Sequence, residues 1–180
     1  MSDTNQTIRN FYTKAIEQDF ARDYLFRVLS INLAGGLTLG DSELIYVKSA
    51  TLPGKDISNI DVKYMGFNFN IPGTVSYPNS NGYSLDFYCD IGSSLRDMML
   101  EESLRTFDDE TSTSSISRIP PLDSSITLAQ LDHNLNAFNV FALKGVSIRN
   151  VGDVAYEIAE GTGSVKSFTA TFAYQFFEKQ

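Results

Sequence analysis

The strongest constraint on the fold is a two-residue alternation near the end of this 180-residue chain. Between Val165 and Phe177, apolar side chains occupy every second position, and mostly small polar side chains lie between them. The first set is Phe168, Ala170, Phe172, Tyr174 and Phe176, and the second is Thr169, Thr171, Ala173 and Gln175. Because successive side chains of a β-strand point to opposite faces, the pattern predicts one long strand with a core face and a solvent-facing wall.

Strand patterns recur along the chain. We predict further strands at 24–33, 44–52, 61–71, 83–89, 138–148 and 154–158. The first of these is apolar on both sides at its start, which favours a strand covered on both faces. Met65-Gly66 bends 61–71 into two short strands, Pro72-Gly73 ends that stretch, and the glycines of 160–164 predict a hairpin turn before the last strand. Cys89 lies on the apolar side of 83–89, where a small core residue is expected.

Two segments have helical periodicity instead. Near the N-terminus, Ile8, Phe11, Tyr12, Ala15 and Ile16 share one face, after capping residues at Asp3 or Thr4. A second helix is predicted from about Ser94 to Phe107, with Ser94 as its cap and Leu95, Met98, Met99, Leu100, Leu104 and Phe107 in a broad apolar stripe. The residues alone therefore predict a mostly β domain with two helices.

The segment 108–117 has the composition of a surface loop, because its Ser, Thr and acidic residues cannot bury enough apolar surface to form a core. We interpret 108–136 as a surface insertion in a single domain that spans 1–180, since too little chain remains for a second core.

Charge and motifs exclude several function classes. The net charge of −8 disfavours a protein that grips nucleic-acid phosphates. His133 is the only histidine, Cys89 is the only cysteine, and no nucleotide-binding or nucleophile motif is present. Asp108, Asp109 and Glu110 are expected to form a solvated acidic loop. We predict no catalytic residue, no cofactor, no metal site, no membrane anchor and no signal peptide, in a chain made in the cytoplasm.

Three stretches together resemble the tail-tube proteins of contractile-tailed bacteriophages, a family related in fold to the Hcp tube protein of type VI secretion. The first runs from Asp19 to Val28 and resembles the entry into the family's first strand. The second contains Ala50-Thr51-Leu52-Pro53-Gly54, Val62-Lys63-Tyr64-Met65-Gly66 and Ile71-Pro72-Gly73, and resembles a protruding hairpin. The third contains Leu143-Lys144-Gly145-Val146, Asn150-Val151-Gly152-Asp153 and the closing strand 168–177. The chain departs from the family in lacking Trp and in its longer 108–136 region.

The resemblance implies a mainly β fold, an antiparallel β-barrel or sandwich with an N-terminal helix and one flanking helix. It implies hexameric rings that stack into a hollow tube, with tail sheath and baseplate proteins as partners, in the tail of a virion made in the host cytoplasm. DNA would pass through the lumen without specific binding, and an acidic or neutral wall suits that passage because it does not hold phosphates.

The resemblance and the apolar patterning also suggest where subunits meet. A hairpin as aromatic as 64–69 cannot bury its own faces, so the expected contacts there are Tyr64, Met65, Gly66, Phe67 and Phe69. The N-terminal helix adds Phe11, Tyr12 and Ile16, whereas Thr169, Thr171 and Gln175 are expected to face the lumen. That the hairpin and the helix fold back on their own domain stays open as an alternative.

Other roles stay open as well. The chain could be a ring protein that starts the tube at the baseplate, or the tube protein of a related contractile injection system. A different class is a β-sandwich that binds a ligand such as carbohydrate, with Tyr77, Tyr83 and Tyr88 as contact residues. The absence of Trp disfavours that class, and an enzyme has no supporting motif.

Overall fold

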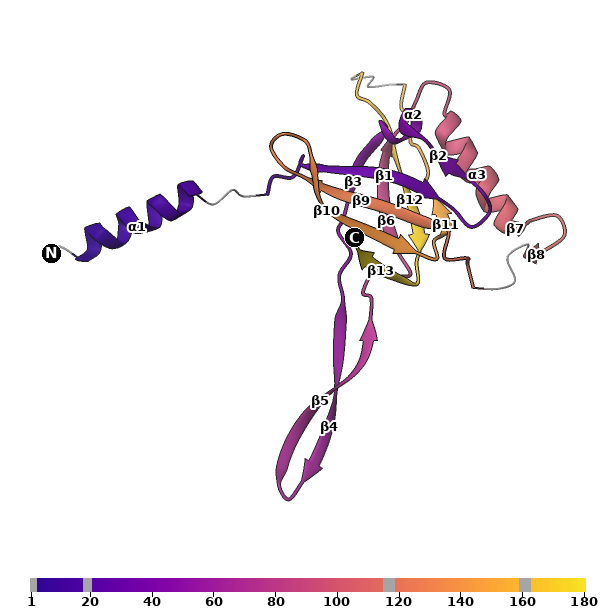
Figure 1. Ribbon diagram of the computed structural model, residues 1–180. Helices are drawn as coiled ribbons and strands as arrows, with labels where there is room; N and C mark the ends of the chain where they lie inside the picture. The colour runs from indigo at the N-terminus through magenta and orange to yellow at the C-terminus, as the bar shows by residue number, and fades with distance from the viewer. Residues whose placement is uncertain (1–2, 18–20, 115–118, 159–162) are drawn as a thin grey trace.

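The computed structural model describes residues 3–17, 21–114, 119–158 and 163–180, and within them the chain is mainly β. Two antiparallel sheets pack face to face as a sandwich, and an N-terminal helix and a long hairpin extend away from it (Figure 1). The fold class predicted from the sequence is therefore confirmed, and of the two expected architectures the described strands form the sandwich. That 1–180 is one domain stays a prediction.

The larger sheet has five strands in the order β13-β10-β9-β1-β2. Their bounds are β1 Phe26–Asn32, β2 Thr38–Leu39, β9 Ser125–Leu131, β10 Ala137–Lys144 and β13 Phe176–Lys179. β9 is the central strand and buries Ile126, Leu128 and Ala129, although it lies within the segment interpreted as a surface insertion. The surface excursion is thus narrower than 108–136, and its described part is the small hairpin of β7 (Phe107–Asp108) and β8 (Thr113–Ser114).

The smaller sheet has four strands in the order β11-β12-β6-β3. Their bounds are β3 Val47–Ala50, β6 Tyr83–Tyr88, β11 Ser147–Val151 and β12 Ser167–Ala173. The inward side chains of β6 and β12, among them Phe87 and Phe172, are fully buried, as their alternation predicts. Phe87 and Phe168 stack across neighbouring strands with their ring centroids 5.5 Å apart.

Two predicted strands are each divided between the sheets. The segment 138–148 is β10 in the larger sheet and β11 in the smaller one, and Gly145 at φ +67° makes the crossing. A side chain at that position would strain the backbone and would place Cβ 2.7 Å from Cγ of Gln175. The segment 165–177 divides in the same way into β12 and β13, so Phe176 belongs to the opposite sheet.

Other predictions need smaller corrections. The segment 154–158 is not a strand, and the hairpin turn predicted at 160–164 lies mostly outside the described residues. β1 buries Val28 and Ile31 but exposes Arg27 and Leu29, because only one face of the larger sheet meets the core.

The helix α3 (Ser94–Thr106) lies against β11 and closes one side of the sandwich. Leu95 and Met99 enter the core, whereas Leu104 and Phe107 are exposed, so the buried stripe is narrower than predicted. Ser94 is not the cap: its own N–H and hydroxyl donate hydrogen bonds to Oδ2 of Asp90. Glu102 is buried beside the core, where its carboxylate accepts hydrogen bonds from the N–H groups of Gly35 at 2.7 Å and Leu37 at 3.2 Å.

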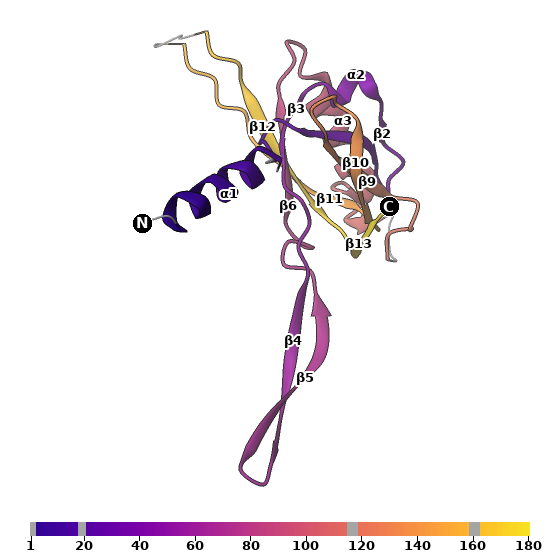
Figure 2. The ribbon, with the colours of Figure 1, turned by 60° about the vertical axis from the view of Figure 1, so that its left-hand side comes forward.

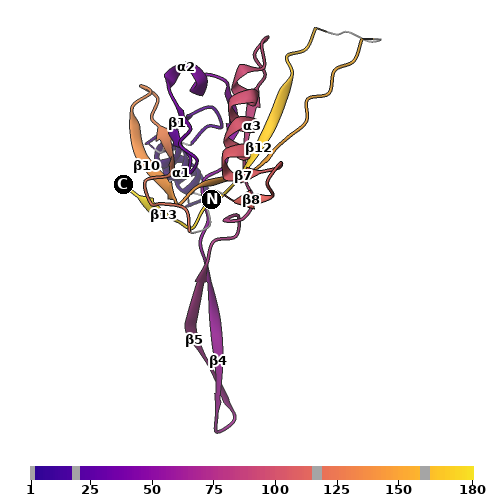
Figure 3. The same cartoon turned by 90° about the vertical axis from the view of Figure 1, so that its right-hand side faces the viewer.

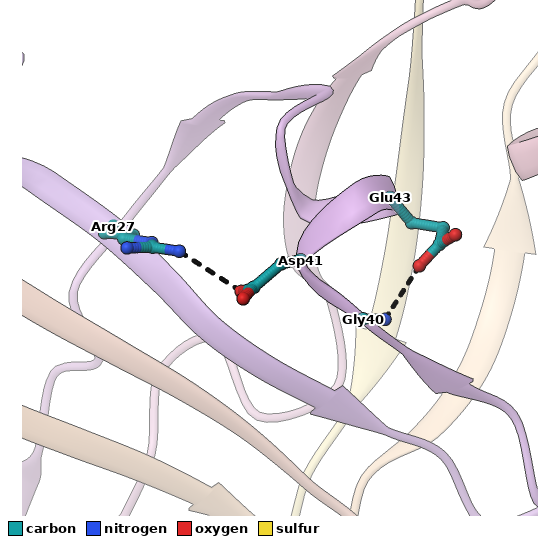
Figure 4. A network of polar contacts seen from close by, with 4 residues as sticks. All are labelled: Arg27, Gly40, Asp41 and Glu43. Carbon is teal, nitrogen blue, oxygen red and sulfur yellow. Dashed lines mark hydrogen bonds and ion pairs between the residues drawn. The ribbon is translucent and has the colours of Figure 1, made fainter.

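A short helix that the sequence reasoning missed, α2 (Asp41–Leu44), connects β2 to β3. Figure 4 shows how its first turn is held. The N–H of Gly40 donates to Oε2 of Glu43 at 2.8 Å, and Arg27 on β1 forms an ion pair with Asp41 at 3.1 Å. The hydroxyl of Ser42 and the N–H of Gly40 lower the pKa of Glu43, because both stabilise its carboxylate.

Candidate assembly surfaces

The protruding hairpin consists of β4 (Asp56–Tyr64) and β5 (Phe67–Ser76), which pair with each other and with no other described strand. Met65 and Gly66 form its two-residue turn with φ +48° and +82°. Two positive φ values are the signature of a type I′ turn, whose twist matches that of the flanking strands. The turn was predicted correctly, but both strands are longer than expected.

One face of this hairpin is apolar. Three directly opposed pairs form it: Tyr64 with Phe67, Val62 with Phe69, and Ile60 with Ile71. The other face carries Asp61, Lys63, Asn68 and Asn70. The six apolar side chains are 41–69% exposed, and Figures 1 and 3 show the hairpin extending well clear of both sheets. The hairpin therefore has the patterning of a half-buried sheet without a layer that covers it.

A β-bulge interrupts the hairpin near its base. Gly73 and Thr74 of β5 together oppose Ser58 of β4, since the register shifts between Ile57 and Asn59. The added residue reverses the face on which β5 side chains lie, so the next apolar pair, Ile57 with Val75, is out of phase with the three pairs near the tip. Pro72-Gly73 was predicted to end the strand, and that prediction is wrong: β5 continues to Ser76, because an edge strand tolerates a missing N–H donor.

Aromatic residues hold the base of the hairpin to the sandwich. The hydroxyl of Tyr83 donates to the carbonyl oxygen of Thr51, ahead of β4, at 2.6 Å. Tyr77, just after β5, packs against Tyr174 and Phe177 with ring centroids 6.3 and 5.5 Å apart. Burial raises the pKa of Tyr83, because an ionised phenol is disfavoured there. Two of the three tyrosines proposed for ligand binding are engaged in the fold: Tyr83 is buried, and Tyr77 packs in this aromatic cluster.

The second protruding element is α1 (Asp3–Glu17), which lies apart from both sheets in Figures 1 and 2. The helix itself is confirmed, and its predicted contact residues Phe11 and Tyr12 are 74% and 68% exposed. The side chain of Ile16 lies outside the described part of the structure. That these residues contact another subunit stays a prediction.

The outer face of the smaller sheet is a wall of small polar side chains. Its outward positions on β6 and β12 are Ser84, Asp86, Tyr88, Ser167, Thr169, Thr171 and Ala173. Asp86 accepts hydrogen bonds from the hydroxyls of Ser49 and Thr169, each at 2.6 Å. Both donors lower the pKa of Asp86, and Ser49 has the larger effect. The structure thus places Thr169 and Thr171 on one surface, whereas Gln175 lies beyond the end of β12, beside Gly145. Their orientation toward a lumen stays a prediction.

Catalytic groups do not gather anywhere in the described residues. Within those ranges, no three His, Cys, Asp or Glu side chains are placed to share a metal ion. His133 is exposed in the turn between β9 and β10, and Cys89 is half-buried with its Sγ 3.4 Å from Oγ of Ser93. Among the described helices, none has the length and apolar content needed to cross a bilayer.

Chains of similar overall fold occur in the solved structures of contractile injection assemblies. A chain in the cryo-EM structure of the anti-feeding prophage (AFP) cap, a tube terminating cap, matches with a TM-score of 0.61 and 11% identity over 91% of this chain and 92% of the other. A chain of the AFP baseplate matches with a TM-score of 0.57 and 13% identity over 91% of this chain and 95% of the other. A chain of the PVC sheath-tube complex in its extended state matches with a TM-score of 0.56 and 11% identity over 91% of this chain and 93% of the other.

The resemblance to tail-tube proteins is therefore confirmed as a likeness of fold. No protein-family model matches the sequence, and no curated protein matches it significantly.

Proposed function

We propose that this chain is a structural subunit of a phage tail tube, which assembles into hexameric rings stacked as a hollow channel for DNA. The observation that carries the proposal is the hairpin β4–β5, whose apolar face is exposed along its length. Full burial of one large apolar side chain contributes about 1.5–3 kcal/mol, so six of them represent a large unrealised gain. An exposed apolar surface of this kind marks a protein interface.

A further copy of this chain is the partner that suits the hairpin best. Chains of the same fold occur in cap, baseplate and sheath-tube assemblies, which supports self-association as the use of the fold. Both described sheets also have free edges, at β2 and β13 and at β3 and β11. Closure into a ring pairs such edges between subunits, which removes the tendency of an open edge to aggregate.

The wall on β6 and β12 suits a lumen. Asp86 is the only charged residue among the outward positions of these two strands, so β6 and β12 themselves offer DNA phosphates no cation to bind; the nearby Lys48 on β3 lies over the ring of Tyr88 at 5.8 Å from its centroid. A tube placed in the tail of a virion would also contact sheath and baseplate proteins on its outer side. The proposed role is structural and needs no catalysis.

Two related roles share the same support. A ring protein that starts the tube at the baseplate, or a tube subunit of another contractile injection system, would need the same hairpin and wall. The baseplate and cap structures favour keeping the ring role as the second candidate.

Electron microscopy and mass photometry of the purified full-length chain test the proposal. Hexameric rings or stacked tubes are the expected result, and tubes of many rings favour the main subunit over the initiator. A monomer that persists up to high protein concentration, without rings or tubes, contradicts the proposal.

A further inference from the structure

A groove of about 430 Å³ opens at the end of the sandwich where β1 begins. It lies between residues 21–26, the loop after β3 and the turn that joins β9 to β10. Its walls are mostly apolar and include Leu25, Phe26, Leu52, Leu128, Leu131 and Phe138. Phe138 is 59% exposed and Leu52 44%, so the chain's own elements leave the groove open. Its volume falls within the range of about 300–1,000 Å³ that is usual for binding pockets.

The helix α1 carries a stripe that matches such a groove. Ile8, Phe11 and Tyr12 share one helix face and are all more than half exposed. Exposed Arg9 and Lys14 flank that stripe, one on each side. The helix thus presents an apolar ridge between two positive charges.

The rim of the groove carries the opposite charge. Asp23, which is exposed, and Asp132 in the β9–β10 turn both border the groove, and the antiparallel pairing of β1 with β9 places them close together. The N–H groups of Asn136 and Asn134 each donate to Oδ1 of Asp132 at 2.8 Å, and these hydrogen bonds, with Asn136 the larger cause, lower its pKa because they stabilise the carboxylate. Arg22 also borders the groove and keeps its positive charge, since its hydrogen bond goes to the hydroxyl of Tyr24 at 2.7 Å; two aspartates and one arginine therefore leave the rim acidic by one charge.

We propose that α1 of one copy binds in this groove of a second copy, so that neighbouring subunits exchange their N-terminal helices. The choice of a second copy as partner rests on the proposed function and on the attraction between a helix flanked by two cations, Arg9 and Lys14, and a rim with a net negative charge. A helix of 15 residues spans about 22 Å, and α1 extends away from its own sandwich (Figure 2), so it can reach a neighbour. Each copy then gives one helix and receives one, which is a heterologous contact, and such a contact closes into a ring when the rotation between neighbours divides the full circle.

Disulfide trapping between two differently labelled full-length proteins tests the exchange. Both carry Cys89→Ser; one also carries Tyr12→Cys on α1, and the other carries Leu52→Cys in the groove. Oxidation of the mixture is expected to give a Tyr12–Leu52 linked dimer in several-fold excess over a mixture of Tyr64→Cys and Leu52→Cys proteins. Electron microscopy of the same samples before oxidation records whether rings or tubes form.

Charge reversal sharpens the test. Asp23→Lys in the groove protein should lower the yield of linked dimer, and a helix protein that reverses a single cation, Arg9→Glu alone or Lys14→Glu alone, should restore it, because Asp132 stays available to the remaining cation. Asp153→Lys is the matched control, because Asp153 is an exposed acid outside the groove. Its dimer yield should equal that of the parent protein.

Several results would overturn the exchange. Preferred linkage of Tyr64→Cys to the groove would make the hairpin its occupant. A double variant, Tyr12→Cys with Leu52→Cys in one chain, that is linked within the monomer would show that α1 binds its own groove. Rings or tubes without Tyr12–Leu52 linkage would refute the exchange but leave the tube function intact, whereas linked dimers without rings would support the exchange and contradict the tube function. Absence of both would contradict both proposals.

Discussion

Strand β12 in the sandwich and strand β5 in the hairpin have the same sequence pattern and opposite environments. In β12, the alternate residues Phe168, Ala170 and Phe172 are at most 2% exposed. In β5, the alternate residues Phe67, Phe69 and Ile71 are at least 51% exposed. Alternation therefore defines an apolar face, but it does not say which chain covers that face. The sandwich covers β12 with its own second sheet, and we propose that the hairpin depends on another subunit.

The strongest test of the difference between the two regions is to replace one phenylalanine by alanine in each of them. Phe172→Ala removes a fully buried ring and should lower the free energy of unfolding by about 3–5 kcal/mol. Phe67→Ala removes an exposed ring and should change it by less than about 0.5 kcal/mol in the monomer. Urea denaturation monitored by circular dichroism measures both, and similar losses in the two variants would contradict the distinction between the regions.

A second test concerns a polar group that belongs to the sandwich. Glu102→Ala leaves the half-buried N–H groups of Gly35 and Leu37 without their acceptor and should cost about 1–3 kcal/mol. Its neighbour Glu101 is exposed and forms an ion pair with Arg105 at 3.8 Å, so Glu101→Ala should cost less than about 0.5 kcal/mol. Thermal and urea unfolding compare the two, and equal costs would mean that Glu102 does not hold the β1–β2 turn to α3.

The hairpin variant Phe67→Asp/Phe69→Asp should separate assembly from folding. Stability of the monomer is expected to change by less than about 0.5 kcal/mol, because neither side chain enters the core. Rings and tubes should disappear, because two charges would enter an apolar contact. Light scattering and circular dichroism record the two properties. The matched control is Asn68→Asp/Asn70→Asp on the polar face, which should form more rings and tubes than Phe67→Asp/Phe69→Asp does. If Phe67→Asp/Phe69→Asp instead loses its fold, the hairpin packs on its own sandwich.

The smallest effect concerns the wall of the smaller sheet. The pKa of Asp86 is lowered in the folded state, so its stabilising contribution is present above its usual pKa of 3.8 and is lost as pH falls through the lower folded value. Asp86→Asn should therefore be less stable than the parent at pH 5, and the difference should shrink at pH 3. Urea denaturation at both pH values checks this, and a pH-independent difference would exclude the charge as its cause.

Local patterns predicted the parts of the fold that depend on local chemistry. The Met65-Gly66 turn, the buried faces of β6 and β12, and the helix α3 follow from glycine, alternation and helical spacing. The crossing at Gly145 was not predicted, because a lone glycine within a strand-like segment can also mark a bulge, and only the packing of two sheets divides 138–148 here. Glu102 gave no signal either, since a glutamate becomes a buried acceptor only when a distant turn supplies its donors.

The candidate surfaces show the same limit. Exposed aromatic residues at 64–69 were predicted from the inability of two strands to cover themselves, and the structure exposes them. The groove was missed, because its walls come from four separate segments that only the folded sandwich brings together. Only a weak signal for the groove is present in the sequence, which is the apolar Leu52 beside the turn residues Pro53-Gly54.

The aromatic cluster at the base of the hairpin has a consequence for association. Tyr83 holds the chain that enters the hairpin and Tyr77 holds the chain that leaves it, so its direction is preorganised before a partner arrives. Binding then loses less conformational entropy than it would with a freely moving arm, for which each immobilised side chain costs about 0.5–1.5 kcal/mol. In the proposed tube, which would grow by repeating one contact, this lower entropic cost would recur at every addition, and Tyr77 and Tyr83 would thereby lower the protein concentration at which growth begins.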